Sequence, residues 1–114
     1  MKSFNEWMNE GRAPRFKDSK YYFNKRVVCA DGFSISIQAN NGAYCKPRRD
    51  IKDISSYYEF ELCFPSDKDE SILHYAENPD CPVDTVYPYV PRYLVEEMIE
   101  SHGGIVAFSK PKAA

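Results

Sequence analysis

The side chains able to do nucleophilic or acid–base chemistry are few in this chain of 114 residues: two histidines and four cysteines. His74 lies mid-way along a predicted helical stretch, "ILHYAE", and His102 lies at the end of another, where a helix favours positive charge. Either could activate a cysteine, but no flanking motif supports such a pair. The sequence also lacks a phosphate-binding glycine loop, Gly-x-Ser-x-Gly and His-Glu-x-x-His. We therefore expect a non-enzymatic protein without catalytic residues.

The four cysteines are spaced widely along the chain, at positions 29, 45, 63 and 81. Zinc sites usually take two ligands from one tight turn, and no Cys-x-x-Cys pair exists here. Free thiols that pack as small hydrophobic side chains are the favoured interpretation, with disulfides and reactive thiols as alternatives. We expect no metal and no other cofactor.

Cations and tyrosines gather in two segments. The stretch "DGFSISIQANNGAYCKPRRD", residues 31–50, is typical of a β-hairpin that runs directly into a cluster of cations, and the segment "VYPYVP" is stiffened by prolines. Rigid rings and arginines are the usual energetic anchors of interfaces. The candidate partner-binding residues are therefore Tyr44, Lys46, Arg48, Arg49, Tyr87 and Tyr89.

The net charge of −2 conceals a bipolar chain. Residues 1–52 carry 11 positive and 5 negative groups, a net +6, whereas residues 53–114 carry 4 positive and 12 negative groups, a net −8. If the halves stay separate, one surface is cationic and suits nucleic acid, and another is acidic and could imitate a phosphate backbone. Alternatively, the charges of an ordinary solvated loop pair with the acidic half on folding.

Strand signals dominate the middle of the sequence. "KRVVCA" is apolar, Asp31 and Gly32 form a hairpin turn signal, and "FSISIQA" alternates with Phe33, Ile35 and Ile37 on one side. "YYEFELCF" alternates as well and predicts Tyr58, Phe60, Leu62 and Phe64 as inward-facing residues. "VYPYVP" could pair at a sheet edge, where proline is tolerated, and "GIVAFS" is a fourth strand candidate.

Helix signals flank these strands. "SFNEWMNE", residues 3–10, opens with a capping box and predicts a short helix that ends at Gly11, followed by a basic extended arm or loop over residues 12–19. "SDKDESILHYAENP" predicts a second short helix, and the stretch from Pro91 to His102 the clearest one, capped by Gly103. The length of the chain suits one domain, 1–114. We predict a single α+β domain: an antiparallel sheet of three to four strands, with the C-terminal helix packed on one face and a short N-terminal helix at its edge.

The segments "VVCADGFSISIQANNGAYCKPR" and "TVYPYVPRYLVEEMIESHGGI" resemble small uncharacterised proteins of bacteriophages and prophages. The resemblance begins after residue 25 and assigns no role to any residue. It implies a setting: small phage proteins of this size commonly act by binding, and many are inhibitors of host defence, including anti-CRISPR proteins.

The expected function is therefore that of a phage-type binding protein that inhibits a host defence complex by occluding a macromolecular surface. Its partner would be a host protein or ribonucleoprotein complex, in the host cytoplasm. No run of about 18 apolar residues and no apolar signal region occur, so no membrane association is expected. Direct nucleic-acid binding by the basic half is the alternative, and a cysteine-dependent enzyme is a third hypothesis.

Overall fold

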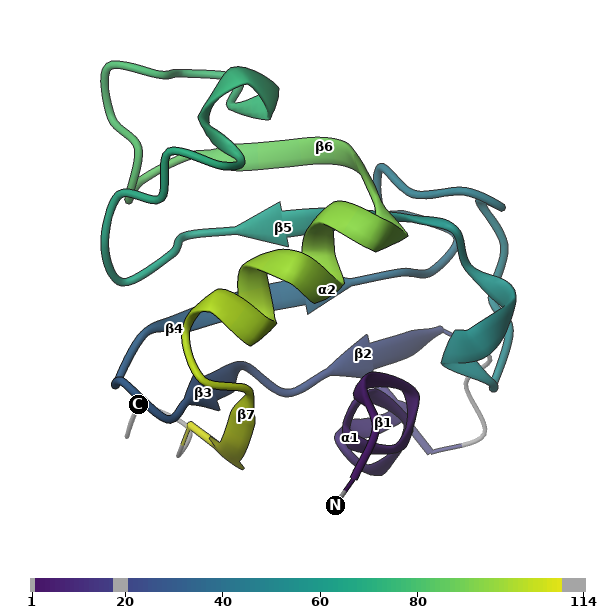
Figure 1. Cartoon of the computed structure of the whole chain (residues 1–114). Coiled ribbons are helices and arrows are strands. Elements are labelled where there is room, and N and C mark those ends of the chain that lie inside the picture. The colour runs from purple at the N-terminus through teal and green to yellow at the C-terminus, as the bar shows by residue number, and fades with distance from the viewer. Residues whose placement is uncertain (1, 18–20, 110–114) are drawn as a thin grey trace.

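Five antiparallel strands form the central sheet, in the order β6–β5–β4–β3–β7, and one helix, α2, crosses a face of it (Figure 1). The computed structural model describes residues 2–17 and 21–109. The α+β class, with two helices and an antiparallel sheet, is confirmed, but the sheet has more strands than the three to four expected, and the placement of the helices differs slightly from the prediction. The elements are β3 (Val27–Cys29), β4 (Ser34–Gln38), β5 (Glu59–Cys63), β6 (Val86–Pro91), α2 (Arg92–Ser101) and β7 (Ile105–Phe108).

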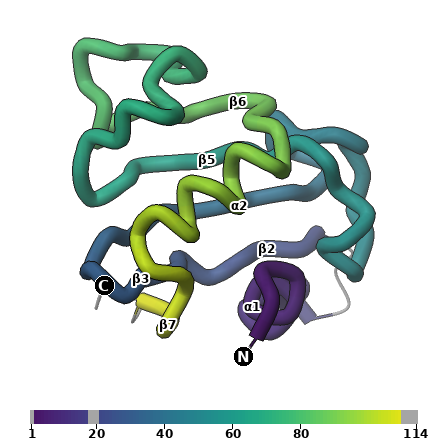
Figure 2. Tube along the Cα trace, viewed as in Figure 1, coloured from purple at the N-terminus to yellow at the C-terminus, as the bar shows by residue number. Residues whose placement is uncertain are grey.

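The N-terminal elements lie beside one end of this sheet (Figure 2). Helix α1 (Phe4–Glu10) begins at the predicted capping box, in which Ser3 and Glu6 each accept a backbone N–H of the other at 3.1 Å. Part of the predicted basic arm forms a strand, since β1 (Arg12–Pro14) pairs with β2 (Tyr22–Asn24). No helix in the described part of the chain has the length and apolarity needed to cross a bilayer.

The β3–β4 hairpin follows the sequence pattern. Gly32 adopts a positive φ of 93° in the turn, and the Cys29 N–H donates to the carbonyl of Phe33 at 2.7 Å. Phe33 and the two isoleucines of β4 are buried on the side of α2, as predicted. Gln38, on the other side, is buried too. Its side-chain amide accepts the N–H of Asn24 and donates to the carbonyl of Asn24, so its polar atoms are hydrogen-bonded in the buried position. We call this second side of the sheet the polar face.

The predicted orientation of residues 57–64 is correct only at its centre. Phe60 and Leu62 are buried, but Tyr58 and Phe64 are exposed and Tyr57 is buried instead. Tyr57 lies before β5, directly after the 3₁₀ turn η1 (Ile54–Ser56), and therefore does not follow the strand alternation. Phe64 has a positive φ of 51°, which turns its side chain away from the register of the strand.

The predicted helix over residues 66–79 is wrong. The only helical turn described there is the 3₁₀ turn η2 (Leu73–Tyr75). The Ser66 hydroxyl does not cap a helix, because it accepts the backbone N–H of Ser34 at 2.9 Å. Asp69 accepts both the N–H and the hydroxyl of Ser71, a local turn that competes with helix formation.

Strand β6 is an edge strand that contains prolines, as its sequence allows, and it carries a β-bulge. Phe60 pairs with Val90 and Leu62 pairs with Tyr87, so one residue of β5 stands opposite Pro88 and Tyr89 of β6. Tyr89 adopts a positive φ of 55° at this point. The extra residue allows both Tyr87 and Val90 to be buried while Tyr89 remains exposed.

Helix α2 ends in a Schellman motif that also brings it against the hairpin. The N–H of Gly103 donates to the Glu100 carbonyl at 2.9 Å, and that of Gly104 donates to the Ile99 carbonyl at 3.0 Å. Both glycines have a positive φ, 89° and 84°. A Cβ on Gly103 would lie 2.8 Å from the Cβ of Ala30, whereas a Cβ on Gly104 would meet nothing within 4 Å.

We therefore expect Gly103→Ala to destabilise the protein more than Gly104→Ala. The positive φ costs about 1–2 kcal/mol in either variant, and the overlap with Ala30 adds about 1 kcal/mol or more in Gly103→Ala alone. Urea unfolding of the two variants measures the difference in free energy of unfolding. Equal losses would contradict the described contact between Gly103 and Ala30.

Candidate functional site

The connection between β4 and β5 carries four of the candidate binding residues, Tyr44, Lys46, Arg48 and Arg49, and is fixed to the sheet through Tyr44. The Tyr44 N–H donates to the Glu61 carboxylate at 2.9 Å, and its carbonyl accepts the N–H of Tyr89 at 3.0 Å. Asn40 shapes the turn before it, since its side-chain oxygen accepts the N–H groups of Gly42 and Ala43 at 2.9 and 2.8 Å. Both backbone groups of Tyr44 are thus bound by residues of β5 and β6.

This attachment assembles rings and cations from two distant segments. The ring centroids of Tyr44 and Tyr89 are 5.9 Å apart. The Arg48 guanidinium carbon lies 5.3 Å from the Tyr44 centroid, and the Lys46 Nζ lies 5.9 Å from the Tyr89 centroid. All four side chains are exposed, with Tyr44 at 40% and Tyr89 at 38%. We call these four residues the Tyr44–Tyr89 cluster.

The remaining two candidate residues are placed differently. Tyr87 is fully buried, and its hydroxyl donates to the Pro82 carbonyl at 2.5 Å. Tyr87 therefore does not belong to the surface, because the bulge separates it from Tyr89. Arg49 is exposed, but the guanidinium that contacts the Tyr44 ring is that of Arg48.

The cations of the cluster are not neutralised by carboxylates. Among the described residues, the ion pairs join Lys2 to Glu10, Lys68 to Glu70, and His102 to Asp31 and Asp69. No lysine or arginine of the basic half is paired with an acid of the acidic half within residues 2–17 and 21–109. Arg48 Nε donates to the carbonyl of Asn41 at 3.2 Å, but the side chains of Lys46 and Arg48 are exposed, so their positive charge is available to another molecule.

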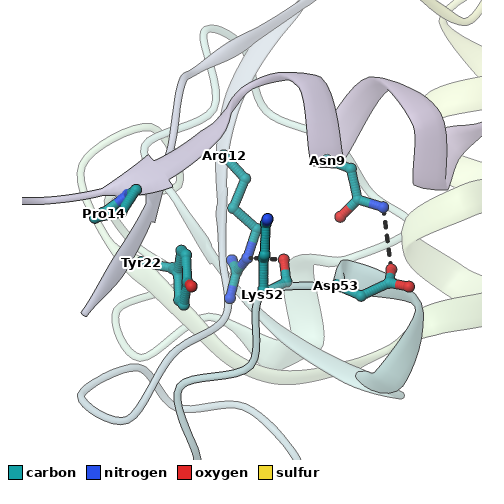
Figure 3. Close-up of a pocket in the computed structure, with 6 residues that line it drawn as sticks. All are labelled: Asn9, Arg12, Pro14, Tyr22, Lys52 and Asp53. Carbon is teal, nitrogen blue, oxygen red and sulfur yellow. Dashed lines mark hydrogen bonds between the residues drawn. The ribbon is translucent and has the colours of Figure 1, made fainter. Parts of the chain in front are cut away.

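Other arginines are structural. Figure 3 shows Arg12 at the wall of a cavity of about 510 Å³. Its guanidinium donates to the carbonyls of Ile51 and Lys52 at 2.7 and 3.1 Å and to the side-chain oxygen of Asn24 at 2.6 Å. Arg26 likewise donates to the carbonyls of Ser34 and Phe64, at 3.0 and 2.6 Å. These side chains stabilise loops and do not offer a free cation to an anionic ligand.

A second cluster of rings and a cation was not predicted. The Arg15 guanidinium carbon lies between 5.7 and 5.9 Å from the ring centroids of Phe16, Tyr21 and Phe23. Phe16 is 66% exposed and Phe23 is 47% exposed. The sequence pattern "RFK" and "YYF" contains the signal, but only the pairing of β1 with β2 brings the two parts together.

A groove on the polar face is lined by two rings of this second cluster. Its volume is about 320 Å³, and Tyr21 and Phe23 line it together with Ala43, the neighbour of Tyr44. Gln38 and Glu61, which face each other across β4 and β5, also line it. The polar face thus carries a shallow groove lined by aromatic rings, amides and the carboxylate of Glu61, and no lysine or arginine is among the described residues that line it.

His102 is held between two carboxylates. Its Nδ1 lies 2.6 Å from Asp31 and its Nε2 lies 2.7 Å from Asp69, while its ring stacks on Phe33 at 3.8 Å. Burial alone would lower the pKa of His102, but the hydrogen bonds to both carboxylates raise it above its usual value. The two hydrogen bonds join the end of α2 to the hairpin turn and to the loop after β5. Because both ring nitrogens are hydrogen-bonded, neither is free to activate a thiol.

The cysteines are free thiols in the described structure. Cys29, Cys45 and Cys63 are buried, whereas Cys81 is exposed. Burial raises the pKa of Cys29 to about 11 and that of Cys63 to about 12, and it raises the pKa of Cys45 as well. No three His, Cys, Asp or Glu side chains of the described residues form a group suited to a metal ion.

Comparisons with protein-family models, with curated proteins and with solved structures give no match for this chain.

We expect a thiol reagent to modify Cys81 rapidly and the other three cysteines only on unfolding, because a buried thiol of raised pKa forms little thiolate. Absorbance with Ellman's reagent on native and urea-unfolded protein counts the thiols in each state. Cys81→Ser is the control and should abolish the rapid reaction. A rapid reaction that persists in Cys81→Ser would show that one of the three cysteines described as buried is accessible.

We expect His102→Gln to lower stability in a pH-dependent way. The pKa of His102 is higher in the folded state than in the unfolded state. Its contribution to the free energy of unfolding is therefore fully present below the unfolded pKa of about 6.5, and it is lost as the pH rises through the folded pKa. At pH 6 the variant should lose about 1–2 kcal/mol, since two charge-assisted hydrogen bonds disappear, and at pH 9 the loss should be smaller.

Urea unfolding at the two pH values measures this difference, with His74→Gln as the matched control because His74 is exposed. A loss for His102→Gln that is the same at pH 6 and pH 9 would show that the carboxylates do not hold an imidazolium.

Proposed function

We propose that this protein is a non-enzymatic binding protein of phage type whose Tyr44–Tyr89 cluster docks on an acidic surface of a host protein complex and occludes it. The observation that carries this proposal is the exposed arrangement of two tyrosine rings with Lys46 and Arg48, whose charges no carboxylate of the described residues neutralises. Tyrosine and arginine supply most of the binding energy in many interfaces.

The cluster is suited to binding because its backbone is already ordered. The N–H and the carbonyl of Tyr44 are both hydrogen-bonded, and the N–H of Tyr89 is bonded to Tyr44. Side chains on an ordered backbone lose less conformational entropy when they bind than side chains on a flexible loop. The two cations would steer an acidic partner towards the rings and fix its orientation.

The setting of this proposal comes from the sequence. The resemblance of residues 27–48 and 85–105 to phage proteins favours a host defence complex as the target, and the absence of catalytic motifs favours inhibition by occlusion. All four residues of the Tyr44–Tyr89 cluster fall inside the two segments that resemble phage proteins.

Single-stranded nucleic acid is the second candidate ligand. The Arg15 cluster and the groove of about 320 Å³ favour it, because rings can stack on bases while cations contact phosphates. The carboxylate of Glu61 in that groove acts against it, since it repels phosphates. Binding to oligonucleotides that weakens steeply with salt would favour this candidate over the first.

We expect the double variant Lys46→Glu/Arg48→Glu to capture a host partner in an amount about tenfold lower or less, because the reversed charges repel an acidic surface. The measurement is quantitative mass spectrometry of proteins captured from nuclease-treated bacterial lysate by the wild type and the variant. Nuclease treatment separates protein partners from those held through nucleic acid.

The control is Lys25→Glu/Lys68→Glu, which changes the net charge equally at two exposed lysines outside the cluster. It should retain the partner, and circular dichroism should show that both variants fold. A partner captured equally well by Lys46→Glu/Arg48→Glu would overturn the proposal.

A further inference from the structure

A groove of about 560 Å³ lies on the α2 side of the molecule, away from the polar face. Its lining residues come mainly from helix α1, helix α2 and strand β7, and Figure 1 shows how these elements are arranged. Its apolar lining includes Phe4 and Trp7 from α1, Ile99 from α2 and Val106 from β7. Val106 is 54% exposed, and the Trp7 ring is only partly buried, with its edge-on contact to Phe108 at 5.5 Å.

The rim of this groove is acidic. Glu96 and Glu100 line it, stand one helical turn apart and are exposed. Neither forms an ion pair among the residues that the structure describes. The cation that lines the groove, Lys2, is paired with Glu10 and lies 4.3 Å from the centroid of the Trp7 ring. Glu96 interacts electrostatically with Arg92, but neither carboxylate is held in an ion pair within the described residues, so both present negative charge beside an apolar floor.

The strand at this groove is also the last one of the sheet. β7 pairs with β3 on one side, and on the other it pairs with no strand of the described residues. Edge strands with unpaired backbone groups accept extended peptides. An extended segment could thus place apolar side chains against Val106 and Trp7 while its cations approach α2.

We infer that this groove binds an extended peptide segment of a partner protein in which apolar side chains alternate with lysine or arginine. The apolar side chains match the floor, and the cations match Glu96 and Glu100 together with the negative end of helix α2. This inference does not rest on the proposed function, because it concerns a surface of opposite charge and different elements.

Trp7 is the single tryptophan of the chain and lines the groove, so its fluorescence reports binding directly. The probes are two synthetic hexapeptides with blocked ends, one of alternating lysine and leucine and one of alternating glutamate and leucine. We expect a saturable change of Trp7 emission with the lysine peptide and none with the glutamate peptide. The double variant Glu96→Gln/Glu100→Gln should weaken binding of the lysine peptide about tenfold at low salt.

The matched control is Glu97→Gln, on the same helix and exposed but not among the lining residues, which should bind as the wild type does. Lys46→Glu/Arg48→Glu should also bind normally, so a failure of the proposed function leaves this result intact. The inference is overturned if the lysine peptide leaves Trp7 emission unchanged, if both peptides bind equally, or if Glu97→Gln weakens binding as much as the double variant.

Discussion

The long connection between β4 and β5 has few backbone hydrogen bonds of regular structure. Two arginine side chains supply hydrogen-bond donors to its backbone carbonyls. Arg12 donates to the carbonyls of Ile51 and Lys52, and Arg92 donates to those of Ile54 and Tyr57 at 2.8 Å each. A buried carbonyl without a donor would destabilise the fold, so these guanidinium groups fix the path of the connection. Tyr44, Lys46, Arg48 and Arg49 lie on this connection, and their placement depends on its path.

The bulge in β6 is the second determinant of the surface. It turns Tyr89 out of the strand and directs its N–H to the carbonyl of Tyr44, so that an edge strand and a loop share one aromatic pair. The same bulge keeps Tyr87 in the core.

The cations of the basic half of the chain have two different roles. Arg12 and Arg26 stabilise loops, while Lys46 and Arg48 remain at the surface.

Local patterns predicted the elements whose stability is local. The capping box of α1, the alternation around Ile35 and the glycine cap of α2 each satisfy backbone or burial requirements within a few residues, and the structure has all three. The predicted helix over 66–79 is wrong because Ser66 and Asp69 bind groups on other elements, the N–H of Ser34 and the ring of His102, and a linear pattern does not show those hydrogen bonds. Alternation also treats Tyr87 and Tyr89 as equivalent, and only the strand register separates them.

Binding of a partner through the Tyr44–Tyr89 cluster can be measured by NMR cross-saturation. Saturation passes from a protonated partner to the amide protons of this protein, which is otherwise deuterated. We predict loss of amide signal at Tyr44, Lys46, Arg48 and Tyr89, with signals of α2 and β7 unaffected. Loss confined to other surfaces, with the amides of Tyr44 and Tyr89 unchanged, would contradict it.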